Sequence, residues 1–227
     1  MPRIISWNTQ GDSISKLSEV YGKLLSSGND NIIMIQEAGN VVAMYGSTFQ
    51  KSYGSSTRGG HSFDATFYAQ TNAKNQRCTT GMLVENGFTV NAFNPFVTTT
   101  GRRPVVACEC SYEDQDFVFA TVHSTANEHP AKKELLEINR MFKNKYDDVC
   151  PWLVMGDFNC DAEKLDFDDI NISFPDSQTQ ENGNTLDFAI FSDSMLDALG
   201  EVNVEIYSDP EGYVPLESDH FPVYCEF

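Results

Sequence analysis

The sequence predicts an α/β fold in which two β-sheets pack on each other with helices on the outside. Short apolar segments of strand-like composition alternate with amphipathic segments of helical period. The middle of the chain is rich in the strand-like segments, and two longer segments have the spacing of helices. Strand runs interrupted by two main helices are typical of packed sheets with outer helices. A length of 227 residues fits a single domain, residues 1–227.

The N-terminal part predicts a strand, a helix and a second strand. Ile4–Trp7 is the first strand, and Asp12 or Ser13 can cap the helix that follows. Gly28 suits the end of that helix, and Ile32–Gln36 is then a buried strand that ends at Glu37. The apolar residues of the helix recur at helical spacing: Ile14, Leu17, Val20, Tyr21, Leu24 and Leu25.

The rest of the chain predicts further strands and a second long helix. The helix can begin at Pro130, with Leu135, Ile138, Phe142 and Tyr146 on one face. Turn-forming residues separate the strands. The predicted strands are Ala65–Ala69, Gly81–Glu85, Val105–Glu109, Phe117–His123, Trp152–Met155, Leu186–Ile190 and His220–Glu226.

The net charge limits how the chain can bind nucleic acid. The chain has 33 acidic and 15 basic residues, which gives a formal net charge of −18. Affinity for phosphates normally comes from a cationic surface, so this charge argues against tight, non-specific coating of DNA. It does not argue against DNA cleavage, because carboxylates that hold a catalytic cation are part of the acidic count.

Targeting signals and metal-binding cysteine pairs are not evident. No apolar run approaches the roughly 20 residues of a membrane helix, and the opening MPRIISWN lacks a basic region followed by an apolar one. We expect a cytoplasmic protein, or a secreted or delivered one whose leader was removed. None of the six cysteines forms a C-x-x-C pair, so we expect most of them to be small buried residues.

Polar side chains recur at the ends of the predicted apolar strands, where rigid scaffolds usually place functional groups. Each is a weak signal alone, because carboxylates and amides are common in turns. Six such sites in one chain are hard to explain as turn chemistry. They are Asn8 in S-W-N, Glu37 in I-Q-E, His123 in T-V-H, Asp157 and Asn159 in G-D-F-N, Asp187 in T-L-D-F-A-I, and Asp219 and His220 in S-D-H-F-P-V.

In this order, the motifs resemble the endonuclease/exonuclease/phosphatase superfamily, which includes pancreatic deoxyribonuclease. Within it, the sequence resembles most the catalytic B subunit of cytolethal distending toxins. That subunit shares the W-N-x-Q-G opening (residues 7–11), I-Q-E-A-G (residues 35–39), T-L-D-[FY]-A and the S-D-H-F-P-V close. The resemblance extends from Trp7 to Val223. It implies a four-layer α/β/β/α sandwich with the site in a cleft at one end of two mixed sheets.

The resemblance also implies a divalent cation, Mg²⁺ in the first place, with Mn²⁺ or Ca²⁺ as a substitute or assistant. Glu37 would be its main ligand, and Asn8 and Asp219 would help directly or through water. Oxygen ligands are the ones that Mg²⁺ prefers, and it keeps several of its waters.

Phosphodiester hydrolysis requires proton transfers and stabilisation of the charged transition state. The resemblance implies that His123 and His220 transfer the protons, one as base and the other as acid, in either assignment. Asp187 would orient His220 by accepting its ring N–H. Asp157 would position the water or bind metal, and Asn159 would donate to a phosphate oxygen. Both reach the cleft only if the chain turns between them.

Three further residues are candidates for supporting roles. Arg103, in G-R-R-P, matches the place of a phosphate-binding arginine in the toxin branch, although its neighbour Arg102 could take that place instead. A guanidinium suits a phosphate because it can donate two parallel hydrogen bonds. Thr185 could add a hydroxyl to the phosphate, and Asp64, just before a strand, could orient the second histidine.

The sequence therefore favours a Mg²⁺-dependent hydrolase that nicks DNA as the toxin subunit does. An alternative keeps the same centre but acts on a phosphoinositide or another phosphomonoester, because function follows site loops more than fold. The negative charge makes that alternative more credible. A third hypothesis is a binding protein that kept the scaffold without catalysis. A toxin-like subunit would also imply carrier proteins on other chains.

Overall fold

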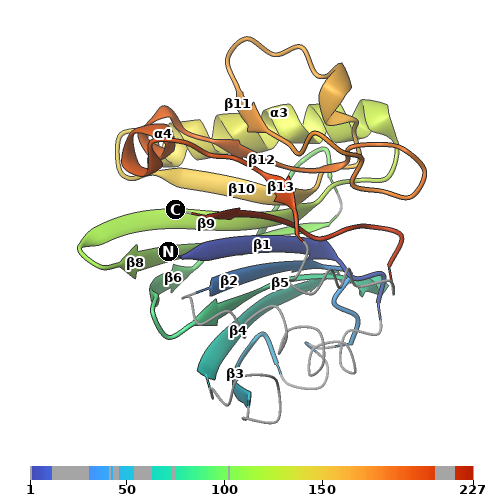
Figure 1. The fold of residues 1–227 in the computed structure, drawn as a ribbon. Helices are drawn as coiled ribbons and strands as arrows, with labels where there is room; N and C mark the ends of the chain where they lie inside the picture. Colours follow the sequence, from blue (N-terminus) through green and yellow to red (C-terminus); the bar gives the residue numbers. More distant parts are fainter. Residues whose placement is uncertain are drawn as a thin grey trace.

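The structure of the protein is a computed structural model. It describes residues 2–11, 31–40, 42, 46–53, 63–72, 75–101, 103–207 and 218–226. Within these residues the chain forms two mixed β-sheets that lie one above the other, with helices on the outer side of one of them (Figure 1). The prediction of two packed mixed sheets with helices outside is confirmed.

In the described residues the first sheet has the strand order β13-β14-β1-β2-β5-β4-β3. At its centre β1 runs parallel to β2 and antiparallel to β14. Its strands are β1 (Arg3–Asn8), β2 (Asn31–Gln36), β3 (Thr48–Tyr53), β4 (Phe63–Asn72), β5 (Asn75–Glu85), β13 (Glu205–Ile206) and β14 (Val223–Glu226).

The second sheet, in the same described ranges, has the order β11-β12-β10-β9-β8-β6, and a short strand β7 also pairs with β8. It repeats the central pattern of the first, because β10 runs parallel to β9 and antiparallel to β12. Its strands are β6 (Thr89–Phe93), β7 (Phe96–Val97), β8 (Pro104–Tyr112), β9 (Gln115–His123), β10 (Trp152–Asp157), β11 (Asn171–Ser173) and β12 (Asp187–Phe191).

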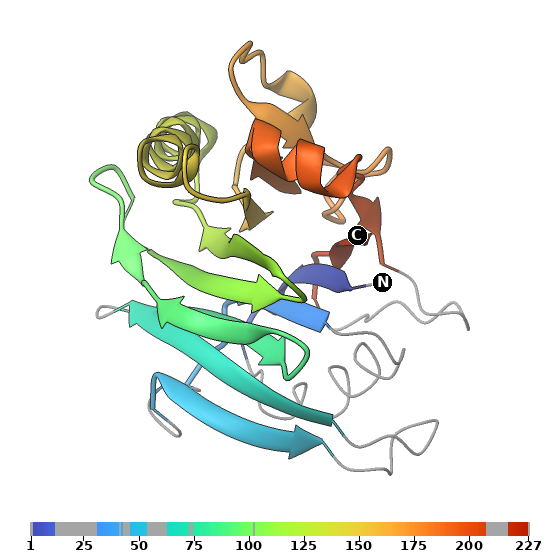
Figure 2. The same ribbon diagram turned by 90° about the vertical axis from the view of Figure 1, so that its left-hand side faces the viewer.

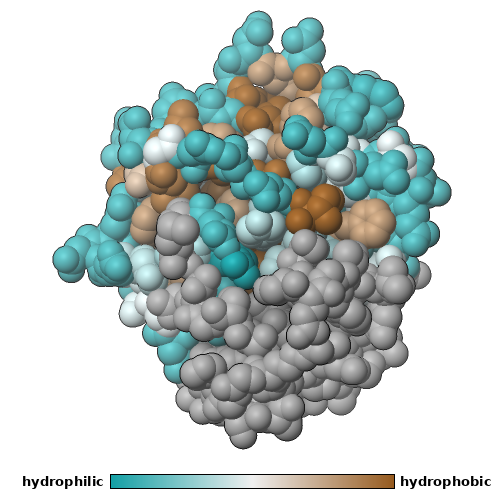
Figure 3. All heavy atoms as spheres, in the orientation of Figure 1, coloured by the Kyte–Doolittle hydropathy of each residue, from teal (hydrophilic) through white to brown (hydrophobic). Residues whose placement is uncertain are grey.

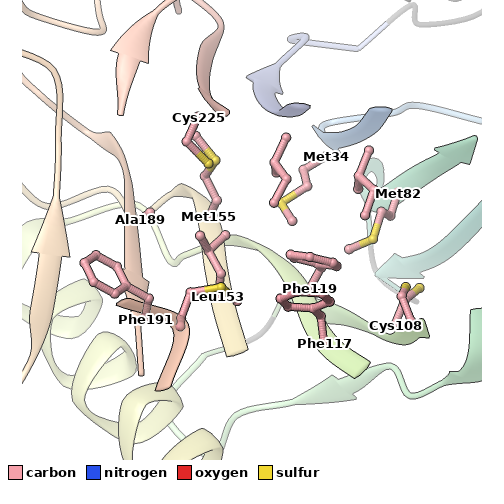
Figure 4. Close-up of a cluster of buried hydrophobic side chains, with 14 of the residues drawn as sticks. Met34, Met82, Cys108, Phe117, Phe119, Leu153, Met155, Ala189, Phe191 and Cys225 are labelled. Carbon is pink, nitrogen blue, oxygen red and sulfur yellow. The ribbon is translucent and has the colours of Figure 1, made fainter. Parts of the chain in front are cut away.

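The interior between the sheets is built by alternate residues of each strand, since side chains of a strand point to opposite faces in turn. Met34 and Met82 come from the first sheet and meet Phe119, Leu153 and Met155 of the second (Figure 4). All five side chains are inaccessible to solvent. Burying each of them stabilises the fold by about 1.5–3 kcal/mol, so this contact fixes the two sheets relative to each other.

The outer face of the second sheet is covered by α3 (Glu128–Tyr146), and α4 (Asp193–Leu199) lies beside it (Figure 2). Leu135, Ile138 and Phe142 of α3 are buried against Trp152 and Val154 of β10. The predicted apolar face of this helix is thus confirmed. A short 3₁₀ turn, η1 (Ala162–Lys164), follows β10.

Several predicted boundaries need correction. The helix α3 begins at Glu128, so that Pro130 lies inside its first turn, where the missing N–H of proline costs nothing. Asp64 lies within β4 and not before it, because its backbone pairs with Ser52 of β3. His220 forms an isolated bridge with Gln180, and β14 starts only at Val223. The helix predicted from Asp12 or Ser13 to Gly28 lies outside the described residues.

The remaining predictions about the surface and the cysteines can be compared directly. The described residues show a largely hydrophilic face interrupted by apolar patches (Figure 3). None of the helices in the described part of the chain is both long and apolar enough to cross a bilayer. All six cysteines are free thiols; five are buried, as expected, and Cys150 is partly exposed.

Candidate active site

The candidate site lies where the central strands of both sheets end. In each sheet two parallel strands finish side by side: Asn8 is opposite Gln36 in the first sheet, and His123 is opposite Asp157 in the second. Asp157 is also opposite Asp187, where the antiparallel β12 begins. Because β1 and β2 pack against β9 and β10, these strand ends converge at one edge of the sandwich.

The period-2 alternation of the strands determines which side chains enter the gap between the sheets. On β10, Leu153 and Met155 belong to the apolar interior, and the next residue on that face is Asp157. The same alternation leads from Phe119 to His123 on β9. The apolar core thus changes into a polar one at the strand ends, and Gln36 marks the change by donating to Thr121 Oγ1 at 2.7 Å across the gap.

The chain turns sharply just after these strands. Gln10, Glu37 and Asn159 have φ angles of 52°, 56° and 51°, in the left-handed region that residues other than glycine rarely adopt. Such strained residues cluster at functional sites, where the surrounding structure over-determines them. The turn at Asn159 is the one that the G-D-F-N motif requires for both polar residues to reach the site.

Gly156 is needed for a different reason. A Cβ atom at this position would lie 2.2 Å from the backbone oxygen of Val122 on β9, so any other residue would push the two strands apart. The close approach keeps the ends of β9 and β10, and with them His123 and Asp157, in register.

Seven of the predicted residues form one chain of contacts. His123 Nε2 lies 3.9 Å from Glu37 Oε1 and 3.3 Å from Asp157 Oδ2. Asp157 Oδ2 accepts a hydrogen bond of 2.9 Å from Asn8 Nδ2 and lies 3.9 Å from His220 Nε2. His220 in turn contacts Asp187 and Asp219, at 2.8 Å and 3.7 Å. The structure therefore brings Glu37 and His220 into one cluster.

Among the described residues of the cluster, exposure to solvent differs from one side chain to another. The side chains of His123, Asp157, Asp187 and His220 are at most 5% exposed. Glu37 and Asp219 are 12% and 31% exposed. A substrate would therefore enter past Glu37 and Asp219 and would find the histidines behind them.

The carboxylates of the cluster determine the protonation of His220. Burial lowers the pKa of its imidazole, but the charges of Asp187, Asp157 and Asp219 outweigh burial and raise it to about 10. Asp187 accepts the hydrogen bond of Nδ1, which leaves Nε2 facing the centre of the cluster. Burial and the neighbouring Asp187 raise the pKa of Asp157 to about 6. The neighbouring carboxylates thus favour the protonated form of His220.

Two glutamines that the sequence interpretation missed hold Asp219. Gln10 Nε2 donates to Asp219 Oδ1, and Gln180 Nε2 donates to Asp219 Oδ2 at 3.5 Å and lies 3.3 Å from His220 Nε2. Gln10 stands in the W-N-T-Q-G opening, so its motif was visible. Gln180 lies in a loop between β11 and β12 without any motif, and only its pairing with His220 reveals it.

The donor set of the cluster suits a hard cation. Asp157, Asp187 and His220 each offer one ligand atom within 4.8 Å of the others and could hold a metal ion. Asp187 Oδ1 is buried and has no hydrogen-bond partner among the described residues. Glu37 and Asp219 lie nearer to solvent, and the prediction that their carboxylates hold the ion stays a prediction.

Arg103 lies at the rim of the same cluster. Its Nη1 donates at 2.9 Å to the backbone oxygen of Ser124, the residue after His123. Asn159 Nδ2 donates to that same oxygen at 3.0 Å, and the N–H of Asn159 donates to Asp157 Oδ1. Two of the three side chains predicted to bind phosphate, Arg103 and Asn159, therefore converge beside His123. Arg102 lies outside the described residues.

The other two supporting candidates are placed less directly. Thr185 is buried, and its carbonyl oxygen accepts a hydrogen bond from the N–H of Ala162. Its predicted contact with a phosphate stays a prediction. The backbone of Asp64 belongs to β4, whereas its side chain lies outside what the structure describes. Its predicted role as the partner of the second histidine also stays a prediction.

The loop before Arg103 is held by Glu137 of α3, which accepts from the N–H and hydroxyl of Thr99 and the N–H of Thr100. Burial raises the pKa of this carboxyl, but the donors of Thr99 and Thr100 outweigh it and lower the pKa to about 2. An unfolded glutamate titrates near pH 4.3. The stabilisation is therefore present above about pH 4.3 and is lost as the pH falls toward 2.

Replacing Glu137 with glutamine is therefore expected to lower the free energy of unfolding by up to about 3 kcal/mol at pH 7. The two proteins should become nearly equal in stability close to pH 2, because the wild-type carboxyl is then protonated as well. Urea unfolding of both proteins at a series of pH values measures the difference. If the two proteins differed in free energy of unfolding by the same amount at pH 7 and at pH 2.5, the lowered pKa of Glu137 would be contradicted.

Comparisons with known proteins bear out the fold. No family model and no curated protein sequence matches the chain, but many solved structures do. A chain of the Haemophilus ducreyi cytolethal distending toxin has 22% sequence identity and a TM-score of 0.73, with 98% of this chain and 96% of that chain covered. The toxin from Actinobacillus actinomycetemcomitans has 20% identity and a TM-score of 0.74, with 98% and 97% covered.

A different activity is named for a third similar structure, a mannosyl-6-phosphatase of Bacteroides thetaiotaomicron. It has 14% identity and a TM-score of 0.64, with 100% of this chain and 99% of that chain covered. The predicted fold is thus confirmed over nearly the whole length of each chain.

Proposed function

We propose that the chain is a divalent-metal-dependent phosphodiesterase whose substrate is DNA, which it nicks. The observation that supports this most is the contact chain from Glu37 through His123 and Asp157 to His220. This chain of contacts joins the partly exposed carboxylate of Glu37, which suits a cation, to the two buried imidazoles of His123 and His220. Metal-assisted hydrolysis of a phosphodiester requires this combination of an oxygen ligand and proton-transfer groups.

The residues would divide the work as follows. His220, oriented by Asp187, holds a proton at Nε2 and can exchange it with the water or the leaving oxygen. His123 would serve the opposite side of the phosphorus, and Asp157 between them would hold the water in line. Asn159 and Arg103 would donate to phosphate oxygens. Mg²⁺, held by Glu37 with Asn8 and Asp219, would stabilise charge on the phosphate and the leaving oxygen.

DNA is preferred as the substrate because of the toxin-branch motifs at residues 7–11, 35–39 and 218–223 and the similarity to cytolethal distending toxin structures along nearly the whole chain. The net charge of −18 argues against tight coating of DNA but not against its cleavage at a metal site.

A phosphomonoester, such as a phosphoinositide, is the second candidate substrate. It is favoured by the same negative charge and by the fold shared with the mannosyl-6-phosphatase. The site chemistry does not separate the two candidates, because a metal, a base and an acid serve both ester types. The choice between them has to come from measured turnover.

Plasmid relaxation tests the proposal. With Mg²⁺, the protein is expected to convert supercoiled plasmid into the nicked form, and EDTA should abolish this. The alanine variant of His123 should be impaired by at least about 100-fold, as expected when a proton-transfer group is removed. Supercoiled plasmid that stays intact with Mg²⁺, Mn²⁺ and Ca²⁺ would exclude the nuclease proposal.

A phosphoinositide assay on the same preparation distinguishes the second candidate. Release of inorganic phosphate from inositol phospholipid vesicles, without plasmid nicking, would establish the phosphatase instead. No turnover in either assay, together with no heat of Mg²⁺ or Mn²⁺ binding in titration calorimetry, would favour a binding protein that kept the scaffold.

A further inference from the structure

The loop of residues 98–101, which connects β7 to Arg103 and the start of β8, is hydrogen-bonded to α3. Glu137 accepts the N–H of Thr99 at 2.6 Å, its hydroxyl at 2.8 Å, and the N–H of Thr100 at 3.0 Å. Thr98 Oγ1 accepts the N–H of Gly101 at 2.8 Å, which closes the loop on itself. Thr99 and Thr100 thus present three donors to the carboxylate of Glu137.

A second glutamate, Glu134, lies one helical turn earlier. It accepts hydrogen bonds from the segments on both sides of the contact between Arg103 and Ser124. Glu134 is completely buried. Its Oε1 accepts from the hydroxyl of Thr98 at 3.0 Å, and its Oε2 accepts from the N–H of Thr125 at 2.9 Å. Thr125 follows Ser124, whose carbonyl oxygen receives the Arg103 guanidinium. The two oxygens of Glu134 therefore fix the loop before Arg103 and the loop after His123 relative to each other.

Gly101 allows the loop to lie close against α3, because it has no side chain. A Cβ at this position would lie 1.8 Å from Glu134 Oε1 and 2.4 Å from Thr98 Oγ1. No other residue could occupy the position without moving the loop away from α3. The glycine, the threonines and the two glutamates form a matched set, and of these only Gly101, the first residue of G-R-R-P, belongs to the motifs that suggested the function.

A buried carboxylate is costly to desolvate, and it persists where its partners require a defined arrangement. Here the hydrogen-bonded loop leads to Arg103, two residues beyond Gly101. The arginine is partly exposed at the rim of the site. Arginine has many rotamers, so an unsupported guanidinium would lose much freedom when it binds a phosphate. A loop fixed on both sides removes part of that cost before the substrate arrives.

We propose that Glu134 and Glu137 are positioning residues that hold Arg103 ready for a phosphate group of the substrate. This inference rests on the proposed function, because it assumes that the arginine binds a phosphate of a nucleic acid or another phosphoester. It assigns to α3 a role in substrate affinity that acts through the 98–101 loop and through the segment after His123.

A double-mutant cycle on a dye-labelled DNA duplex tests the inference. Replacing Glu137 with glutamine is expected to raise KM by about 5- to 20-fold with little change in kcat, because a misplaced arginine weakens binding and not the proton transfers. Replacing Arg103 with alanine should raise KM at least as much. The glutamine variant should then cause no further increase in the background of the Arg103 replacement.

Two controls keep the outcome interpretable. Glu128→Gln makes the same change on the same helix, where the carboxylate pairs with Lys132, and it should leave KM unaltered. Gly101→Ala disturbs the same fastening from the loop side and should reproduce the rise in KM if the glutamine variant folds poorly. Hydrogen exchange at the N–H groups of Thr99 and Thr100 reports independently whether the loop has been released.

The inference would be overturned if Glu137→Gln raised KM equally with and without Arg103, or if KM stayed constant although exchange showed the loop released. Failure of the proposed function is distinguishable from both results. In that case the wild-type protein itself would turn over neither DNA nor phosphoinositide, whatever the state of the loop.

Discussion

Replacing His220 with alanine is expected to lower kcat for plasmid nicking by about 1,000-fold or more, within the range for loss of a proton-transfer group that is also held in place. The imidazole is fixed on both ring nitrogens. Nδ1 hydrogen-bonds Asp187 at 2.8 Å, and Nε2 faces Asp157 and Asp219. An alanine removes the proton carrier and leaves the three carboxylates without the positive partner that stabilises them.

The variant Asp187→Asn separates orientation from proton transfer. The asparagine keeps the shape of Asp187, but its NH₂ group can donate to Nδ1, which would favour the tautomer with the proton on Nε2 and weaken the imidazolium. We expect a loss of activity close to that of the His220 variant, because the two residues act as a unit. The double variant should therefore lose little more than either single one.

His129 offers a matched control for both variants, since it is an exposed histidine on the first turn of α3. His129→Ala should nick plasmid at the wild-type rate. If the His220 variant retained more than about a tenth of wild-type kcat, the imidazole would not be a proton carrier in the rate-limiting step. Binding of Mg²⁺ should persist in the His220 variant, which shows that the loss is one of chemistry.

The strand ends explain why the sequence predicted so much of the candidate site. His123 and Asp157 end apolar runs with strand periodicity, and Asp187 begins one, so the inward-facing position at that end of each run lies at the edge of the core. The strand pairing then brings these ends together, as the register of β9, β10 and β12 shows. Local pattern and fold agree here, so the sequence was sufficient for these residues.

Residues that act across long chain distances could not be predicted in this way. Gln180 touches the site only because its loop pairs with His220, 40 residues later. Glu134 and Glu137 stand on the helical face that the apolar pattern identifies only as lying next to the core. Their partners, at residues 98–101 and 125, carry no periodic signal. Contacts of this kind follow from the packed fold, whereas periodicity describes neighbours along one element.

The short strands were missed for a related reason. β7 and β13 have two residues each, and β11 has three. Segments this short have no measurable alternation, and they are strands only because a longer neighbour offers them hydrogen bonds. The boundary at Asp64 has the same cause, since pairing with β3 extends β4 beyond its apolar part.

Replacing Glu37 with glutamine is expected to shift the Mg²⁺ concentration for half-maximal nicking upward by about 100-fold or more. Loss of an outer partner of a metal ligand costs about 10- to 100-fold in affinity, and loss of the charged ligand itself should exceed that. Glutamine keeps one oxygen but removes the negative charge, and hard cations depend on carboxylates for affinity. The left-handed backbone at φ 56° is unchanged by the substitution.

Glu113 provides a closely matched control for this substitution. It is also a glutamate in the left-handed region, with φ 50°. It lies exposed in the turn between β8 and β9, just before β9 begins, whereas His123 is the last residue of that strand. Glu113→Gln should leave the Mg²⁺ dependence unaltered.

The Glu37 substitution also acts on the imidazole of His123, which lies 3.9 Å from Glu37. The Mg²⁺ midpoint and the rate at saturating Mg²⁺ are therefore measured separately. An unaltered midpoint with a reduced saturating rate would assign Glu37 to the histidine and leave Asp157, Asp187 and Asp219 as the metal ligands.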